Sequence, residues 1–210
     1  MAGPTNILSD GSALSRLDRA LFRVEGWLAL IAGLAVLGLM ALAVVSVGGR
    51  NFLGRPLSGY VDWIELAMPF IAFLAISYTQ RLGGHVRMDI VIGRLGGRTL
   101  WAAEWLTTLL TLALAVALCW GTWQHFGRSF DWDMPRFSRD SSIDIGLPLW
   151  PAKLVVPVAF AILSLRLALQ LWGFGRAFAR GEERPVAVPL IESAAEVAAA
   201  EAAALERAGR

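Results

Sequence analysis

The sequence predicts an all-α integral membrane protein with four transmembrane helices and both termini in the cytoplasm. Of its 210 residues, 56% are hydrophobic and only 17% are charged, and the mean hydropathy is +0.57. Soluble domains carry about 25% charged residues, so this composition indicates a membrane protein. Two further observations support the prediction: the apolar residues gather in four long runs, and the arginines flank these runs unevenly.

The first run, Trp27 to Val47, contains no charged residue. About 20 apolar residues are enough for a helix to cross a hydrocarbon core of about 30 Å. A secretory signal peptide is the alternative, but its apolar core has only about 7 to 15 residues and ends at a cleavage site. Because this run is longer and 26 residues precede it, we interpret it as a retained helix that follows a cytoplasmic segment at 1–26.

The second span is expected at about 62–80 and must include charged residues, because its uncharged part is short. Asp62 and Glu65 therefore lie near one membrane interface. Pro69 cannot donate a hydrogen bond to the carbonyl four residues earlier, which belongs to Glu65. An acceptor beside a carboxylate favours a partner at this position.

The third and fourth spans are expected at about 100–124 and 150–172. The third carries Glu104 in its first turn, and the fourth carries Lys153 near its start and Arg166 well inside. The polar connection between the two spans is rich in Asp, Arg and Ser and includes several aromatic residues. We expect an ordered extracytoplasmic segment along the membrane interface, where aromatic side chains are enriched.

The distribution of arginines predicts the orientation, because Lys and Arg are preferentially retained in the cytoplasm. The arginines on the predicted cytoplasmic side are Arg16, Arg19, Arg23, Arg81, Arg87, Arg94, Arg98, Arg176, Arg180 and Arg184. Basic residues on the opposite side are interspersed with aspartates. Both termini are therefore assigned to the cytoplasm, with a four-helix membrane domain at 27–176 and an Ala- and Glu-rich tail at 177–210.

Catalytic and cofactor-dependent functions find little support in the sequence. Haem bound by two histidines needs them at one depth on facing helices, whereas His85 and His125 fall at opposite membrane surfaces. No cluster of histidine, cysteine and carboxylate residues has the spacing of metal ligands. Cys119 is interpreted as a packing residue. We expect no catalytic residue, metal or cofactor in this chain.

Charged residues at membrane depth are costly and are usually paired or functional. Glu65 and Lys153 begin their helices on the outer side, so Glu65 is expected to pair either with Lys153 or with a donor on another subunit. Glu104 begins its helix on the inner side, where Arg166 arrives as its helix descends, which predicts a second pair. Snorkelling of Lys153 and Arg166 to the headgroups is the alternative, and the sequence leaves it open.

A polar segment at 77–90 interrupts the apolar sequence with several charges, two glycines and His85. Gly83 and Gly84 allow the positive φ that helix ends commonly need. Arg81 can cap the last carbonyls and meet lipid phosphate. Because no partner for acid–base chemistry lies near His85 in the sequence, we interpret the segment as a turn that docks.

Four fragments carry a family resemblance: Arg50-Asn-Phe-Leu-Gly-Arg-Pro-Leu57, Trp63-Ile-Glu65, Arg81-Leu-Gly-Gly-His-Val-Arg-Met-Asp89 and Gly146-Leu-Pro-Leu-Trp-Pro-Ala-Lys-Leu-Val-Val-Pro157. In this order, and relative to four spans, they resemble the small membrane subunit (DctQ type) of tripartite ATP-independent periplasmic (TRAP) transporters. The resemblance covers about Trp27 to Arg176. The family often has two adjacent acids after the tryptophan, whereas Ile64 precedes a single acid here.

The resemblance implies uptake of an organic acid by symport with a cation, usually sodium. A solute-binding protein delivers the substrate, a large membrane subunit carries substrate and coupling ion, and the small subunit is the scaffold. Implied partners are the large TRAP membrane subunit, the extracytoplasmic solute-binding protein and membrane lipids, with no nucleic acid. The implied location is the bacterial inner membrane, and sodium or another coupling ion is expected in the large subunit.

The residues expected at partner or lipid interfaces are charged or aromatic and lie in loops or at the predicted depths of the span ends. They are Arg50, Trp63, Glu65, Arg81, His85, Arg87, Asp89, Glu104, Arg136, Arg139, Lys153 and Arg166. A structural or assembly subunit of an unrelated membrane complex is the alternative function, and a membrane redox enzyme is a distant third. The sequence does not specify the transported substrate.

Overall fold

The computed structural model describes residues 10–55, 57–83, 98–181 and 188. The elements, in chain order, are α1 (Ala13–Leu53), α2 (Tyr60–Phe73), α3 (Ile76–Arg81), α5 (Arg98–Ser129), the 3-10 helix η1 (Pro135–Phe137) and α6 (Trp150–Arg180). Within the described residues, α1, the α2–α3 unit, α5 and α6 are each long and apolar enough to cross a membrane. The prediction of four helices that are long and apolar enough to span a membrane is therefore confirmed.

Each span is longer than hydropathy indicated, and α1 differs most. Its 41 residues begin at Ala13, well before Trp27. At 1.5 Å per residue, α1 measures about 62 Å, roughly twice the hydrocarbon thickness. Local capping explains the early start, because the Ser12 side chain accepts a hydrogen bond from the amide of Ser15. Gly54, in the left-handed conformation, ends the helix.

The second span breaks at Leu74 and Ala75, which separate α2 from α3. Pro69 lies inside α2, about one turn before the break. After the break, α3 packs against α1 and α6. This packing brings two polar residues of α3, Ser77 and Arg81, against acids of α1.

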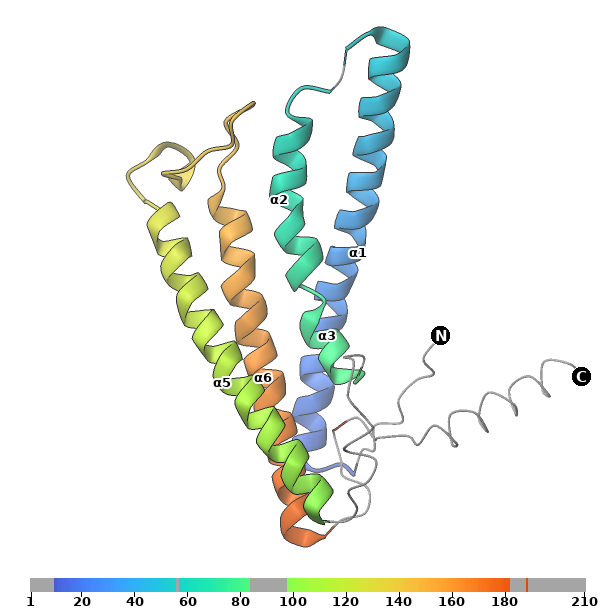
Figure 1. Cartoon of the computed structure of the whole chain (residues 1–210), viewed down its shortest axis with the longest axis vertical. Helices are drawn as coiled ribbons and strands as arrows, with labels where there is room; N and C mark the ends of the chain where they lie inside the picture. Colours follow the sequence, from blue (N-terminus) through green and yellow to red (C-terminus); the bar gives the residue numbers. More distant parts are fainter. Residues whose placement is uncertain (1–9, 56, 84–97, 182–187, 189–210) are drawn as a thin grey trace, which may run out of the picture.

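α6 is the central helix of the fold, since it contacts α1, α2, α3 and α5 (Figure 1). Its Phe160, Leu163 and Leu167 form a buried cluster with Ala115 of α5. In contrast, α1 exposes most of its large apolar side chains between Trp27 and Leu53. The core therefore follows α6, and α1 lies at the side of the bundle.

The two ends of the bundle differ in content (Figure 1). The end at which α1 begins and α6 ends is called the N-terminal end. The opposite end, called the loop end, holds the α1–α2 turn and the α5–α6 loop, residues 130–149. Within this loop, β-bridges join Phe130 to Ser138 and Ser141 to Pro148. The loop is thus ordered, as predicted.

The predicted turn after the second span is only partly described. Gly83 has φ of 65°, which confirms the expected left-handed conformation after the helix. Gly84, His85, Arg87 and Asp89 lie outside the described residues. Nearly all of the predicted tail at 177–210 beyond residue 181 also lies outside them, apart from residue 188.

Candidate functional site

A group of polar side chains is buried at the N-terminal end, and we call it the basal network. It consists of Asp18 and Glu25 from α1, Ser77 and Arg81 from α3, and Arg166 from α6. Asp18, Glu25 and Arg166 are almost completely shielded from solvent. Because such groups lose their hydration, the partners that replace water decide whether the arrangement is stable.

Arg166 is the centre of the basal network and is 0% exposed. Its Nε donates to Oε1 of Glu25 at 2.8 Å, and its Nη2 donates to Oε2 at 2.6 Å. Its Nη1 donates to Oδ1 of Asp18. The planar guanidinium therefore makes a two-point contact with one carboxylate and a third contact with another, a geometry that lysine cannot provide.

The other members complete the coordination of the two carboxylates. Arg81 donates from Nη2 to Oδ2 of Asp18 at 2.7 Å and from Nε to Oδ1 at 3.2 Å. The hydroxyl of Ser77 donates to Oε1 of Glu25 at 2.5 Å. The Arg81 guanidinium also lies 3.9 Å from the centre of the Phe22 ring, a cation–π contact. Two acids and two arginines thus satisfy one another.

Helical spacing explains why these residues meet. Asp18 and Glu25 are seven residues apart, so they share one face of α1. Ser77 and Arg81 are four residues apart and share a face of α3. Arg166 projects from the side of α6 that packs on α1 and α3. The network therefore needs α1 to remain helical well before Trp27, as it does.

Two sequence-based predictions about this end are wrong. Arg166 does not pair with Glu104 or snorkel, because both acids of α1 hold it inside the bundle. Arg81 does not face lipid phosphate, since its side chain is 12% exposed and bound to Asp18. Glu104, on α5, is itself buried. The sequence gives the approximate depth of an acid or a base in the membrane. It does not show which sides of two helices contact each other.

At the loop end, Asp62 joins the start of α2 to the α5–α6 loop. Asp62 is only 2% exposed. Its carboxylate accepts hydrogen bonds from the Ser142 hydroxyl at 2.6 Å, the Ile145 amide at 2.8 Å and the Asp144 amide at 3.1 Å. Gly59, one turn earlier, has φ of 71°, and a Cβ there would lie 2.5 Å from Ile145 Cδ1. The loop therefore lies directly against α2.

A second anchor joins the loop to α6. Lys153 Nζ donates to Oδ2 of Asp140 at 2.5 Å, and the Ser129 hydroxyl donates to the same oxygen at 2.8 Å. These hydrogen bonds hold the pKa of Asp140 below its ordinary value, and the one from Lys153 has the larger effect. The predicted pair of Lys153 with Glu65 is thus wrong, because an acid from the adjacent loop lies closer to the ammonium than α2 does.

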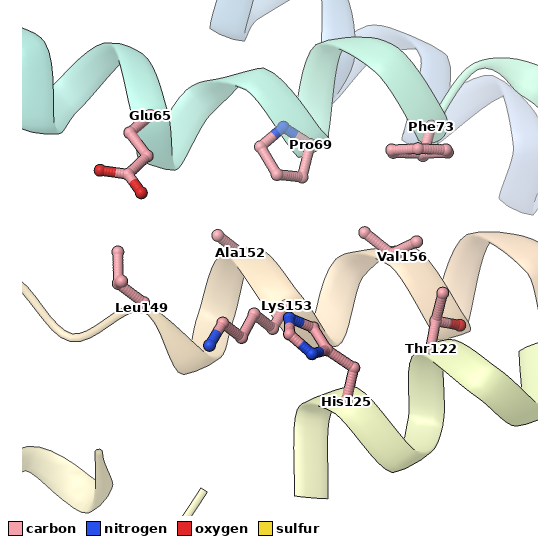
Figure 2. A pocket seen from close by; sticks show the side chains of 9 residues that line it. All are labelled: Glu65, Pro69, Phe73, Thr122, His125, Leu149, Ala152, Lys153 and Val156. Atoms are coloured by element: carbon pink, nitrogen blue, oxygen red, sulfur yellow. The ribbon is translucent and has the colours of Figure 1, made fainter. Parts of the chain in front are cut away.

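Glu65 lies in an open cleft between α2, α5 and α6, which we call the loop-end cleft (Figure 2). The cavity has a volume of about 300 Å³. Its lining residues are Glu65, Pro69, Phe73, Thr122, His125, Leu149, Ala152, Lys153 and Val156. Among the described residues, no hydrogen bond or ion pair to the Glu65 carboxylate is found. The cleft thus combines an unpaired acid with two basic side chains.

The remaining predicted interface residues lie at or near the loop end. Arg50, in the last turn of α1, and Trp63, in the first turn of α2, are both exposed. Arg136 donates to the Gly146 carbonyl at 2.8 Å, and Arg139 is bound to Asp131 at 2.9 Å while its side chain is 55% exposed. All four are accessible to other molecules within the described structure, so their interface roles stay predictions.

No group of three or more histidine, cysteine or acidic residues in the described ranges could hold a metal ion.

A comparison with protein families identifies the chain: the model of the "Tripartite ATP-independent periplasmic transporters, DctQ component" family matches residues 39–176. The chain belongs to the DctQ family. The resemblance noted in the sequence is thereby confirmed. A comparison with curated proteins finds no match.

DctQ proteins are the small membrane component of TRAP transporters, and they work with a large membrane subunit and a solute-binding protein. This chain is therefore a membrane-embedded transporter component. The matched region contains the whole loop-end cleft but begins after the two acids of the basal network. Asp18 and Glu25 were also absent from the residues that sequence reasoning selected. Their seven-residue spacing behind a Ser12 cap is the signal that could have found them.

Proposed function

We propose that this DctQ chain is the fixed scaffold of its transporter, against which the large subunit moves during uptake of an organic acid. The solute-binding protein delivers the acid, and a cation gradient, usually of sodium, drives its entry. The coupling ion and substrate bind the large subunit, so this chain needs no cofactor and performs no catalysis. The observation that supports a scaffold most directly is the basal network, which joins α1, α3 and α6.

A scaffold must keep its shape while its partner moves. Breaking the basal network would leave a buried charge without a partner, which destabilises a fold by about 3 to 5 kcal/mol. Packed cores have discrete arrangements and do not deform continuously. A bundle whose central helix is bound to its neighbours by both apolar packing and a closed ion network therefore favours a static role over a moving one.

The orientation that fits this role places the N-terminal end in the cytoplasm and the loop end outside the bacterial inner membrane. Arg16, Arg19 and Arg23 are exposed near the start of α1, where the positive-inside rule favours the cytoplasmic side. The α5–α6 loop then faces the solute-binding protein. Its Trp132 and Ile143 are 76% and 95% exposed, as expected of an ordered surface that receives a partner.

The first experiment tests the complex. A tagged form of the full chain, expressed with a large TRAP membrane subunit from the same organism, is expected to retain that subunit through purification. Recovery of this chain with an unrelated membrane complex would instead favour the alternative, an assembly subunit of another system.

The second experiment tests whether the scaffold is static. Leu14 of α1 packs against Leu169 of α6, so a Leu14→Cys, Leu169→Cys double variant, in a Cys119→Ser background, places two thiols at this contact for cross-linking by oxidation. We expect oxidation to leave uptake by the reconstituted complex unchanged, and each single-cysteine variant is the control. Loss of uptake on oxidation, reversed by a reductant, would show that α1 must move relative to α6.

A third experiment tests docking at the loop end. The swap Arg139→Asp with Asp131→Arg keeps the ion pair of the loop but exchanges the positions of its charges. We expect slower uptake when the solute-binding protein is limiting, because electrostatic complementarity acts mainly on association rate. Unchanged uptake at limiting binding protein, with normal amounts of complex, would remove this pair from the docking surface.

A further inference from the structure

We infer that the loop-end cleft binds one membrane phospholipid with a primary ammonium headgroup, with the headgroup near Glu65 and Lys153 and an acyl chain toward Phe73. The inference does not depend on the proposed transport role. It rests on how polar and apolar side chains are ordered along the cleft, on which donors and acceptors remain available there, and on the opening of the cleft between helices.

The cleft changes from polar to apolar along the helix axes (Figure 2). Glu65 lies in the second turn of α2, Lys153 in the first turn of α6 and His125 in the last turns of α5. All three are near helix ends, and the ends of helices that span a bilayer reach the level of the lipid headgroups. Phe73 is eight residues further along α2, about 12 Å deeper at 1.5 Å per residue. This order matches that of a phospholipid.

The basic side chains of the cleft provide donors for a phosphate. An ammonium has three donors, and Lys153 uses one of them on Asp140. Two donors therefore remain for a ligand in the cleft. His125, on the opposite wall, is exposed and can donate from its ring. A phosphodiester placed between α5 and α6 would meet both groups, and charge-assisted hydrogen bonds of this kind are among the stronger ones.

Glu65 specifies the rest of the headgroup. A carboxylate near the membrane is costly without a partner, and no partner for it occurs within the described structure. A primary ammonium would pair with this charge and donate hydrogen bonds to it. A trimethylammonium headgroup carries the same charge but has no N–H, so it cannot donate. Glu65 therefore distinguishes the two headgroups.

The deeper part of the cleft suits an acyl chain. Pro69, Phe73 and Val156 supply apolar walls, and Ala152, which is buried, leaves room at the floor. The Thr122 hydroxyl donates to carbonyls of its own helix, Leu118 at 2.7 Å and Cys119 at 3.2 Å. It therefore presents its methyl group and carbon surface to a ligand without an unsatisfied donor.

The test measures lipid bound to the purified full chain by native mass spectrometry. The probes are phosphatidylethanolamine and phosphatidylcholine with identical acyl chains, added at equal concentration to the delipidated protein. We expect phosphatidylethanolamine to bind about tenfold more tightly, since a hydrogen bond to a charged group contributes enough for one order of magnitude. Glu65→Gln is expected to remove this preference, and Asp133→Asn, at an exposed loop acid, to keep it.

A steric variant tests the location. Val156→Trp fills the apolar part of the cleft and is expected to reduce binding of both lipids severalfold, whereas Val44→Trp, at an α1 position that is 73% exposed, is the control. Equal binding of the two lipids by the wild type would overturn the inference, and so would unchanged binding by Val156→Trp. If the lipid binds the isolated chain but is absent from the complex, the large subunit occupies the cleft and the inference is wrong.

Discussion

The two ends of the bundle treat their charged residues in opposite ways. At the N-terminal end, two acids and two arginines bind one another inside the bundle. At the loop end, Lys153 binds Asp140 of the α5–α6 loop, and Glu65 has no partner within the described residues. The comparison teaches that a closed network fixes helices to each other, while an incomplete one leaves groups available for other molecules.

Desolvation explains why the closed arrangement has the larger energetic consequences. A buried charge interacts strongly because little water screens it, and its loss of hydration must be offset by partners. Exposed pairs are screened and contribute only about 0 to 1 kcal/mol. Mutations at the N-terminal end should therefore lower the free energy of unfolding more than comparable mutations at the loop end.

The largest effect is expected for Arg166→Leu. This change leaves the carboxylates of Asp18 and Glu25 without their main donor, and we expect the free energy of unfolding to fall by about 3 to 5 kcal/mol. Unfolding by denaturant in mild detergent measures the change. Arg23→Leu, at an exposed position of α1, is the matched control and should have little effect.

A combined variant separates charge stranding from lost packing. Arg166→Leu with Asp18→Asn and Glu25→Gln removes the stranded charges, although Arg81 then keeps only a neutral partner. We expect this triple variant to recover more than half of the stability lost in Arg166→Leu. If the triple variant is no more stable than Arg166→Leu, the network does not act through charge.

The next largest effect is expected for Asp62→Ala at the loop end. The change removes the acceptor for three donors of the α5–α6 loop, and unsatisfied donors there would favour opening of the loop. We expect severalfold faster cleavage of the loop by added protease, measured on the intact complex. The Asp133→Ala variant should be cleaved at the wild-type rate. Equally faster cleavage of both variants would contradict the anchoring role of Asp62.

A smaller effect is expected for Gly59→Ala. The substitution forces a side chain into a left-handed conformation and against Ile145, with strain of order 1 kcal/mol or somewhat more. We expect a lower thermal unfolding midpoint. Adding Ile145→Ala should recover only the part of the loss that is due to the contact, so complete recovery would show that the backbone conformation is not strained.

The smallest effect concerns pH. The pKa of Asp140 is lowered in the folded state, chiefly by the hydrogen bond from Lys153, so the pair stabilises the fold above the ordinary Asp pKa of about 3.9. That contribution is lost as pH falls through the lowered pKa. Asp140→Asn should therefore unfold at a lower temperature than the wild type at pH 7, and the two should converge in acid. A difference that persists in acid would exclude this charge effect.

Hydropathy was sufficient to predict four helices because their long apolar runs have few alternatives in a bilayer. It was not sufficient for the N-terminal end. Arg16, Arg19 and Arg23 were interpreted as topology signals, and the interleaved Asp18 and Glu25 were therefore not considered. Charged residues before an apolar run do not show whether the helix continues through them.

The pairing of charges could not be predicted for a geometric reason. The sequence gives an approximate depth for Arg166 and Lys153, but rotation about the helix axis decides which neighbour each one meets. The hydrogen bonds of Asp62 depend on the path of a loop in which Arg136 and Phe137 have φ near 58° and 57°. Positive φ at two such residues is not signalled by their identity.

The charge balance of the basal network has a consequence for energised membranes. Moving one elementary charge across 100 mV changes the free energy by about 2.3 kcal/mol. Asp18, Glu25, Arg81 and Arg166 carry two negative and two positive charges that lie together, so the membrane potential exerts almost no net force on them. The network therefore does not couple the positions of α1, α3 and α6 to the membrane potential.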